Sequence, residues 1–278
     1  MSQPANSLAL GLVQMCSAKS HAANIAFVDA TAQEAAAGGC QMLALPEVAG
    51  MMNRRADPAR DGIRIAQDDP FIAACQSIAI RHRLWIHIGS TPVAGGADGR
   101  LLNHSVLVDA GGQIVAAYSK IHLFDIMLNG RKPILESSRY APGTEAVLAQ
   151  TQWGPMGMSI CYDLRFPGLY RDYAHQGARA MFIPSAFTAP TGAAHWEVLL
   201  RARAIETGSF VIAAAQSGPH EDGRETYGHS MVIDPWGQVL ADMADGPGWM
   251  RVDLDLAKSD RVRSSIPALR HDRTYSLA

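Results

Sequence analysis

The feature that most constrains this fold is a strand, a helix and a second strand at the start of the chain. Residues 8–15 (LALGLVQM) are a short apolar run, typical of a strand buried on both faces. Residues 21–37 are rich in alanine, carry apolar residues at helical spacing and stop at Gly38-Gly39. A second apolar run follows at 41–47 (QMLALPE). Because such a unit joins parallel strands, we expect a parallel pair covered by a helix.

The remainder of the chain continues to alternate strands with helices. The patterns predict further helices over 68–83, 167–177 and 195–207, strands over 84–89, 178–184, 210–216 and 249–254, hairpins over 104–118 and 229–243, a turn–strand unit over 146–161, an irregular stretch over 123–145 and an extended tail over 257–278. This order predicts an α/β fold in which helices cover sheets. Since no linker or break in composition appears, we expect a single domain over residues 1–278.

Composition and charge exclude several classes of protein. Hydrophobic residues make up 48% of the chain, enough for a substantial core. The formal net charge of −2 argues against nucleic acid or an anionic membrane as a partner, and basic pairs such as Arg54-Arg55 are interpreted as solvated surface. The apolar run at 8–15 is too short to span a bilayer and has no basic segment before it, so neither a signal peptide nor a membrane anchor is expected.

The cysteines indicate a reducing compartment. The four are widely spaced and form no C-x-x-C pair: Cys16, Cys40, Cys75 and Cys161. A disulfide scaffold is therefore not expected, and the cytoplasm is the predicted location. The chain also lacks the H-E-x-x-H pattern of zinc hydrolases, so no metal site is predicted.

Three polar residues stand where apolar strands stop: Glu47, Lys120 and Cys161. Taken singly, Glu47 would be interpreted as a surface acid, Lys120 as a surface lysine and Cys161 as a buried structural thiol. Together they form a chemical set. A thiol with a pKa of about 8.5 is mostly protonated at pH 7, and a nearby carboxylate can take its proton during attack on a carbonyl. An ammonium group and the backbone N–H of Tyr162 can stabilise the resulting oxyanion, each donor being worth about 3 kcal/mol.

The sequences around these residues resemble the nitrilase superfamily of carbon–nitrogen hydrolases. The similarity runs from Leu8 to about Tyr275 and is carried by Leu45-Pro46-Glu47, by residues 118–123 (YSKIHL) and by residues 159–167 (SICYDLRFP). The resemblance implies a four-layer α-β-β-α sandwich and a Glu-Lys-Cys triad that needs no metal or organic cofactor. It also implies a homodimer or higher homo-oligomer, for which the predicted helices over 167–177 and 195–207 are sufficiently amphipathic.

Within this superfamily the chain is most similar to the branch that contains deaminated glutathione amidase and omega-amidase. The carrying stretches are residues 120–125 (KIHLFD), 184–187 (PSAF), 191–197 (TGAAHWE), 200–207 (LRARAIET) and 227–237 (YGHSMVIDPWG). This similarity implies hydrolysis of a linear amide that carries a carboxylate, with deaminated glutathione giving 2-oxoglutarate and Cys-Gly. Omega-amidase activity on α-ketoglutaramate, hydrolysis of another amide or N-carbamoyl compound, and a non-catalytic binding role stay open.

The resemblance also assigns roles to residues. Glu47 would be the general base, Cys161 the nucleophile and Lys120 the oxyanion partner. Glu136, seven residues before Gly143, matches a second active-site glutamate that positions Lys120 and the substrate. An ordinary loop acid is the alternative for Glu136.

Three further residues would meet the substrate. Arg165 lies four residues after Cys161 and matches an arginine that binds the α-keto carboxylate, for which a guanidinium fork is well suited. A salt bridge at the start of a helix is the alternative role for Arg165. Phe187 and Thr191 fall in a segment that would line the acyl pocket as a loop, although Phe187 could equally belong to the core.

Overall fold

Two mixed sheets lie at the centre of the molecule. The structure is a computed structural model that describes residues 4–55, 61–127 and 133–278. In the first sheet, parallel strands β1, β2 and β3 are extended on both sides by antiparallel neighbours. Its order is β16 (Gly248–Asp255), β1 (Ser7–Gln14), β2 (Met42–Ala44), β3 (Trp85–Val93), β4 (Leu102–Val108) and β5 (Ile114–Ser119).

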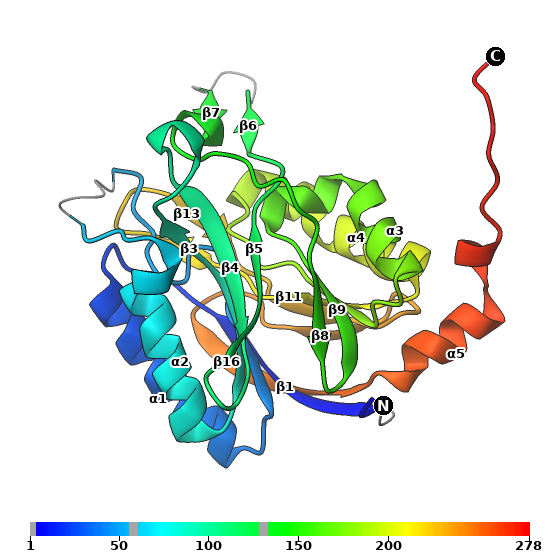
Figure 1. Cartoon of the computed structure of the whole chain (residues 1–278), viewed down its shortest axis with the longest axis horizontal. Helices are drawn as coiled ribbons and strands as arrows, with labels where there is room; N and C mark the ends of the chain where they lie inside the picture. The colour runs from blue at the N-terminus through cyan, green and yellow to red at the C-terminus, as the bar shows by residue number, and fades with distance from the viewer. Residues whose placement is uncertain (1–3, 56–60, 128–132) are drawn as a thin grey trace.

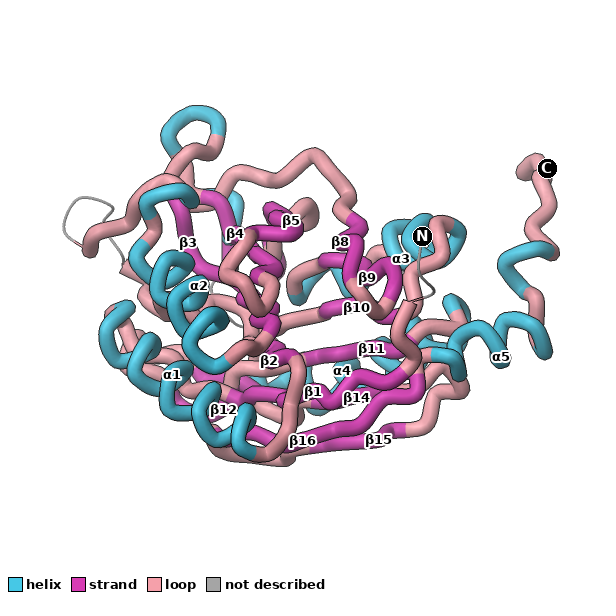
Figure 2. The backbone as a smooth tube through the Cα atoms, turned by 60° about the horizontal axis from the view of Figure 1, so that its bottom comes forward, coloured by secondary structure: helices cyan, strands magenta, loops and turns pink. Residues whose placement is uncertain are grey.

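The second sheet repeats this plan. Its parallel strands β9, β10 and β11 are again flanked by antiparallel neighbours. The order is β15 (Val239–Asp242), β14 (Met231–Ile233), β11 (Phe210–Ala213), β10 (Ala180–Phe182), β9 (Gly154–Met158) and β8 (Leu148–Thr151). Figure 2 shows the strands of both sheets together in the middle of the molecule.

Helices cover the two outer faces. Those of the first sheet are α1 (His21–Ala37) and α2 (Pro70–His82), and those of the second are α3 (Pro167–His175) and α4 (Ala189–Thr207). Figure 1 shows α1 and α2 on one side and α3 and α4 on the other. This arrangement confirms the predicted four-layer α-β-β-α sandwich.

The alternation of side chains along β1 explains the layers. Leu8, Leu10 and Leu12 belong to the core between the two sheets, together with residues such as Met156 and Phe182 of the second sheet. Val13 belongs to the separate core under α1 and α2. Because successive side chains of a strand point to opposite faces, a strand that is apolar on both faces must lie between two layers.

Short elements complete the chain. They are the strands β6 (Asp125–Ile126), β7 (Ile134–Leu135), β12 (Ser217–Pro219) and β13 (Glu225–Tyr227), and the 3₁₀ turns η1 (Ala66–Asp68), η2 (Ala97–Gly99), η3 (Glu136–Ser138), η4 (Cys161–Arg165) and η5 (Ala268–Arg270). The stretch predicted as irregular, 123–145, thus contains β6, β7 and η3, while its residues 128–132 lie outside the described residues. In the described ranges, no helix is both long enough and apolar enough to cross a membrane.

The predicted elements over 195–207 and 257–278 differ most from the structure. Helix α4 begins at Ala189, six residues before the predicted start, because Pro190 is acceptable in a first turn. Gly192, a poor helix former, is needed there because a Cβ at this position would lie 2.2 Å from the Tyr227 ring. Residues 257–265 form helix α5 (Ala257–Ser265) instead of an extended tail. Polar contacts hold α5, such as Arg179 Nη2 to Asp260 at 2.8 Å, and hydrophobic periodicity does not reveal them.

Candidate active site

Three predicted residues, Glu47, Lys120 and Cys161, meet at the strand ends. Glu47 follows β2, Lys120 comes directly after β5, and Cys161 begins η4 shortly after β9. Their exposed fractions are 4%, 2% and 6%, so all three are buried. The two sheets therefore bring a carboxylate, an ammonium group and a thiol together at the carboxyl ends of β2, β5 and β9, where α/β proteins place their sites.

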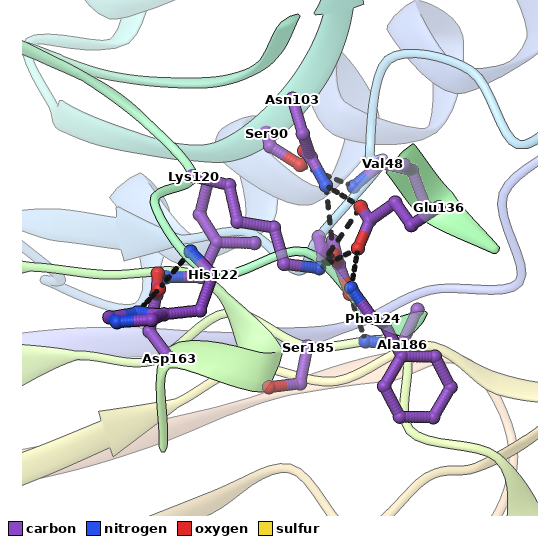
Figure 3. A network of polar contacts seen from close by, with 12 residues as sticks. Val48, Ser90, Asn103, Lys120, His122, Phe124, Glu136, Asp163, Ser185 and Ala186 are labelled. Carbon is purple, nitrogen blue, oxygen red and sulfur yellow. Dashed lines mark hydrogen bonds and ion pairs between the residues drawn. The ribbon is translucent and has the colours of Figure 1, made fainter. Parts of the chain in front are cut away.

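The ammonium group of Lys120 bridges two carboxylates. Its Nζ lies 2.9 Å from Glu47 Oε1, and 3.1 and 2.9 Å from the two carboxylate oxygens of Glu136. Figure 3 shows Lys120 pointing toward Glu136. Glu136 is the first residue of η3, and its side chain is 13% exposed. Since all three ionised groups are largely removed from water, removing any one of them would leave a buried charge without its partner.

Neutral donors also bind the oxygens of the two carboxylates. The Nδ2 amide of Asn103, on β4, donates to Glu47 Oε1 at 2.9 Å and to Glu136 Oε1 at 3.2 Å. The backbone N–H of Ala186 donates to Glu47 Oε2 at 2.8 Å, and that of Phe124 to Glu136 Oε2 at 2.6 Å. Each glutamate therefore has both oxygens bound, which fixes its orientation.

The charges around Lys120 keep it protonated. Burial alone would lower the pKa of its ammonium group, but the carboxylates of Glu136 and Glu47 outweigh burial and raise that pKa well above its ordinary value. The lysine is therefore protonated at neutral pH. A fixed cation can stabilise a negative charge that develops next to it.

The thiol of Cys161 is in the opposite situation. Burial raises its pKa well above the ordinary value, and the charge of Glu47 raises it further. Lys120 and the backbone N–H of Ala186 lower it only in part. The thiol is therefore protonated at neutral pH, and it needs a base in contact before its sulfur can attack.

The backbone at Cys161 is strained. Its φ is +49°, in the left-handed region that a residue with a Cβ rarely adopts, and its N–H donates to the carbonyl of Pro184 at 2.9 Å. The next residue, Tyr162, lies in the first turn of η4, where N–H groups have no acceptor within the helix. A left-handed residue at a strand end turns the chain sharply and exposes the side chain to the cavity.

A buried aspartate joins the segment that carries Lys120 to the turn that carries Cys161. The side chain of Asp163 is fully buried and accepts from Tyr118 Oη at 2.7 Å and from the backbone N–H of Ile160 at 2.8 Å. It also accepts from the backbone N–H of His122 at 3.0 Å and pairs with its Nδ1 at 2.7 Å (Figure 3). Asp163 thus fixes the two segments relative to each other.

The side chains of Glu47, Lys120, Glu136 and Cys161 line one cavity of about 480 Å³, a size typical of small-molecule sites. Its wall is partly apolar and partly charged. The lining residues are Glu47, Val48, Asn53, Arg54, Asn103, Lys120, Phe124, Pro133, Ile134, Leu135, Glu136, Arg139, Tyr140, Cys161, Tyr162, Ala186, Phe187, Thr188, Thr191 and Arg224.

The predicted substrate-binding residues fall into two groups. Tyr162, Phe187 and Thr191 line the cavity, although Thr191 stands in the first turn of α4 and not in a loop. Arg165 is not among the described residues that line it. Its guanidinium carbon lies 5.8 Å from the ring centre of Tyr162 and 5.7 Å from that of Phe187, and Nη2 is 3.2 Å from Nδ1 of His195. Arg165 therefore lies behind two aromatic rings of the wall.

Sequence reasoning missed several residues of the site. Asn103 stands one residue before the predicted start of its strand, so its place inside the sheet was not recognised. Arg54, interpreted as solvated surface, lines the cavity together with Arg139 and Arg224. The sequence did offer one signal for Asn103, a polar side chain just before an apolar strand run. In the structure Asn103 lies beside Lys120 of the neighbouring segment, whose backbone N–H donates to the Asn103 carbonyl at 3.0 Å.

Across residues 4–55, 61–127 and 133–278, no group of three or more His, Cys, Asp or Glu side chains is arranged to hold a metal ion.

The chain matches a known protein family along most of its length. The family model for the carbon-nitrogen hydrolase family matches residues 9–264. The chain belongs to this family, and the predicted membership of the nitrilase superfamily is confirmed.

Similar proteins with assigned names indicate which kind of bond this carbon–nitrogen hydrolase acts on. Deaminated glutathione amidase of Yersinia enterocolitica is 36% identical over 271 residues, which cover 96% of this chain and 93% of that protein. The Mus musculus protein of the same name is 39% identical over 247 residues, or 87% and 76% of the two chains. The crystal structure of the Caenorhabditis elegans NitFhit protein matches with a TM-score of 0.89 at 34% identity, covering 98% of this chain and 66% of that longer one. The chain is accordingly a carbon–nitrogen hydrolase that acts on amides.

Proposed function

We propose that this protein hydrolyses the linear amide bond of deaminated glutathione, releasing 2-oxoglutarate and Cys-Gly, through a thioester on Cys161. The observation that carries the proposal is the ammonium group of Lys120, held 2.9 Å from Glu47 beside a protonated thiol in the cavity. The names of the relatives at 36–39% identity support the choice of substrate.

The first step forms a carbon–sulfur bond. Sulfur of Cys161 attacks the amide carbon while Glu47 takes the thiol proton, since the thiol is not ionised at rest. Negative charge moves to the amide oxygen, which lies between the ammonium group of Lys120 and the backbone N–H of Tyr162. Lys120 is held by its two carboxylates before the reaction, so its ammonium group needs little reorganisation to stabilise this charge.

The second step breaks the carbon–nitrogen bond. As the oxyanion collapses, Glu47 returns its proton to the leaving nitrogen, and the amine half departs as a neutral amine. Water then enters, Glu47 takes one of its protons, and the hydroxyl adds to the thioester carbon. Collapse of the second oxyanion breaks the carbon–sulfur bond, and the proton on Glu47 restores the thiol. Glu136 keeps Lys120 in position throughout.

Three residues complete the proposal on the acyl side. Phe187 and Thr191 would contact the 2-oxoglutaryl group from the cavity wall. Arg165 would bind its α-keto carboxylate, which requires its guanidinium to reach past Tyr162.

Activity against a panel of amides tests the function. Deaminated glutathione, α-ketoglutaramate and a simple aliphatic amide are each incubated with the protein, and 2-oxoglutarate or amine release is measured. We expect deaminated glutathione to give the highest kcat/KM. A higher value for α-ketoglutaramate would make the protein an omega-amidase, and no release from any amide would favour a binding role.

Replacement of the nucleophile tests the chemistry. Cys161→Ala should lower turnover by at least about 10⁴-fold, because no other group can form the thioester. The matched control is Cys16→Ala, which removes an exposed thiol outside the cavity and should retain activity. Mass spectrometry of the quenched wild-type reaction should show the acyl group on Cys161. Retained turnover in Cys161→Ala would rule out the assignment.

We also propose that the protein is cytoplasmic and forms a homodimer or higher homo-oligomer through α3 and α4. Exposed apolar side chains on α4, Val198 and Ile205 among them, support an interface there. Sedimentation analysis of the wild type and of Val198→Glu would test the assembly, with a shift to monomer expected for the variant.

A further inference from the structure

The outer part of the cavity carries an excess of positive charge. Four cationic side chains line its wall, and one of them, Lys120, is neutralised by Glu47 and Glu136. The other three form what we call the arginine rim: Arg54, Arg139 and Arg224. The catalytic chemistry described above uses none of them.

The arginine rim is assembled from three separate parts of the chain. The side chain of Asp222 is 2% exposed, and its Oδ2 accepts from Arg224 Nε at 2.8 Å and from the backbone N–H of Arg54 at 2.9 Å. Arg139 Nη1 donates to the carbonyl of Asn53, at 3.2 Å, and to that of Arg54. Arg54 is thus held by its backbone from two sides, which is more organisation than a solvated surface arginine normally has.

The members of the rim differ in how their charge is used. Asp222 neutralises Arg224 in part, and Arg139 ties down carbonyl groups. In the part of the chain that the structure describes, the Arg54 guanidinium has no hydrogen bond or ion pair, and Arg54 is exposed. An unpaired cation on a cavity wall attracts an anionic ligand, and guanidinium groups match carboxylates in a bidentate manner.

The position of the rim indicates which half of the substrate carries that anion. The reacting groups Glu47, Lys120 and Cys161 are at most 6% exposed, whereas the side chain of Arg224 is 26% exposed and Arg54 more so. The rim therefore lies at the solvent end of the cavity. The acyl half stays bound to sulfur while the amine half must leave and water must replace it, so the amine half occupies the solvent end.

We propose that Arg54 and Arg224 bind a carboxylate on the amine half of the substrate. The inference rests on the proposed amidase function and deepens it: the protein acts on amides whose leaving amine is itself an acid, such as a dipeptide with a free C-terminus. An amide that releases only ammonia leaves the rim unused.

Two substrates that differ at one group test the inference. One is deaminated glutathione, and the other is the same molecule with its C-terminal carboxylate converted to a carboxamide. For the wild type we expect kcat/KM to be roughly tenfold higher for the carboxylate, as for one charge-assisted pair at a partly exposed site. Because the contact is ionic, that ratio should fall as salt is raised.

Variants of the arginine rim then test which side chains cause the preference for the carboxylate substrate. Arg54→Gln should bring the ratio close to one, and Arg224→Lys, which keeps the charge opposite Asp222 but removes the fork, should reduce it. The matched control is Arg81→Gln, an exposed arginine on α2 that makes the same change in net charge and should keep the ratio.

The outcomes separate the two proposals. Equal wild-type rates on both compounds would overturn the arginine rim as a carboxylate site and leave the amidase intact. A preference that survives both rim variants would also overturn it, because another group would then bind the carboxylate. If neither compound is hydrolysed, the proposed function fails and the inference fails with it.

Discussion

The two sheets have the same plan of parallel strands with antiparallel edges, yet they supply different chemistry to the cavity. The first sheet and the segments after it supply Glu47, Asn103 and Lys120, which are charged or hydrogen-bonded to charge. The second supplies a neutral thiol at Cys161 and the backbone N–H of Ala186. One side of the site is thus an ion network, and the other is a nucleophile on a strained turn.

Substitutions on the two sides should therefore differ in their effects on stability and on activity. A lost charge on the first side leaves a buried partner unpaired, so it affects both folding and activity. A lost thiol on the second side removes reactivity and little else. Contacts that join the two sides include the Ala186 N–H to Glu47 and Tyr118 to Asp163.

The largest effect on activity from the first side should come from its base. Glu47→Gln keeps the size of the side chain but cannot accept the thiol proton, so we expect kcat to fall by about 10²- to 10⁴-fold. Steady-state kinetics on deaminated glutathione would measure this fall. Glu197→Gln, on the exposed surface of α4, is the control. An unchanged kcat would mean that another group acts as the base.

A charge removed from the ion network should affect stability as well. Lys120→Met leaves Glu47 and Glu136 buried without their cation, and we expect a loss of about 3–5 kcal/mol in the free energy of unfolding, with kcat lowered about 10²-fold or more. Urea denaturation would measure the first and kinetics the second. Lys19→Met, an exposed change, should alter neither. If Lys120→Met proved as stable as Cys161→Ala, the contrast between the two sides would be wrong.

A smaller effect is expected from Arg165 on the second side. Arg165→Ala should raise KM roughly tenfold for amides of α-keto acids, because a partly exposed guanidinium contributes a modest share of carboxylate binding. KM for an aliphatic amide without a carboxylate is the internal control and should not change. An unaltered KM for the keto acid amides would refute the role of Arg165 as a carboxylate anchor.

A further effect, on stability alone, concerns the contact between the two sheets. His87 of β3 is buried and stacks on Phe182 of β10, with ring centres 4.0 Å apart, and burial lowers its pKa to about 3. The unfolded chain binds this proton near pH 6.5, so stability is complete above that pH and is lost as pH falls toward 3. At pH 5 the loss from His87 should be about 2 kcal/mol.

His87→Gln should remove that part of the pH dependence. Urea midpoints of the wild type and the variant at pH 7.5 and pH 5 would measure it, with His271→Gln, an exposed histidine, as the control. A wild-type loss of stability that is identical in His87→Gln would show that other groups cause the acid sensitivity.

The sequence was sufficient for residues whose place depends on local pattern. Glu47, Lys120 and Cys161 each follow an apolar strand run, and strand ends can be recognised without knowing the neighbours. Asn103 and Arg54 could not be found in this way, because their roles depend on side chains far away in the chain: Glu136 for Asn103 and Asp222 for the Arg54 backbone. Helix α5 was missed for a related reason, since it is held by polar contacts.

The pairing of β1 with β16 has a consequence for how the protein is made. β1 is synthesised well before its antiparallel neighbour β16, which lies more than two hundred residues later, with Leu8 opposite Leu254. Until β16 has been synthesised, the hydrogen-bonding edge of a largely apolar strand stays open to other chains. Nascent chains of this protein should therefore be good clients for chaperones that shield such edges, and slow synthesis of the segment that contains β16 should favour aggregation over folding.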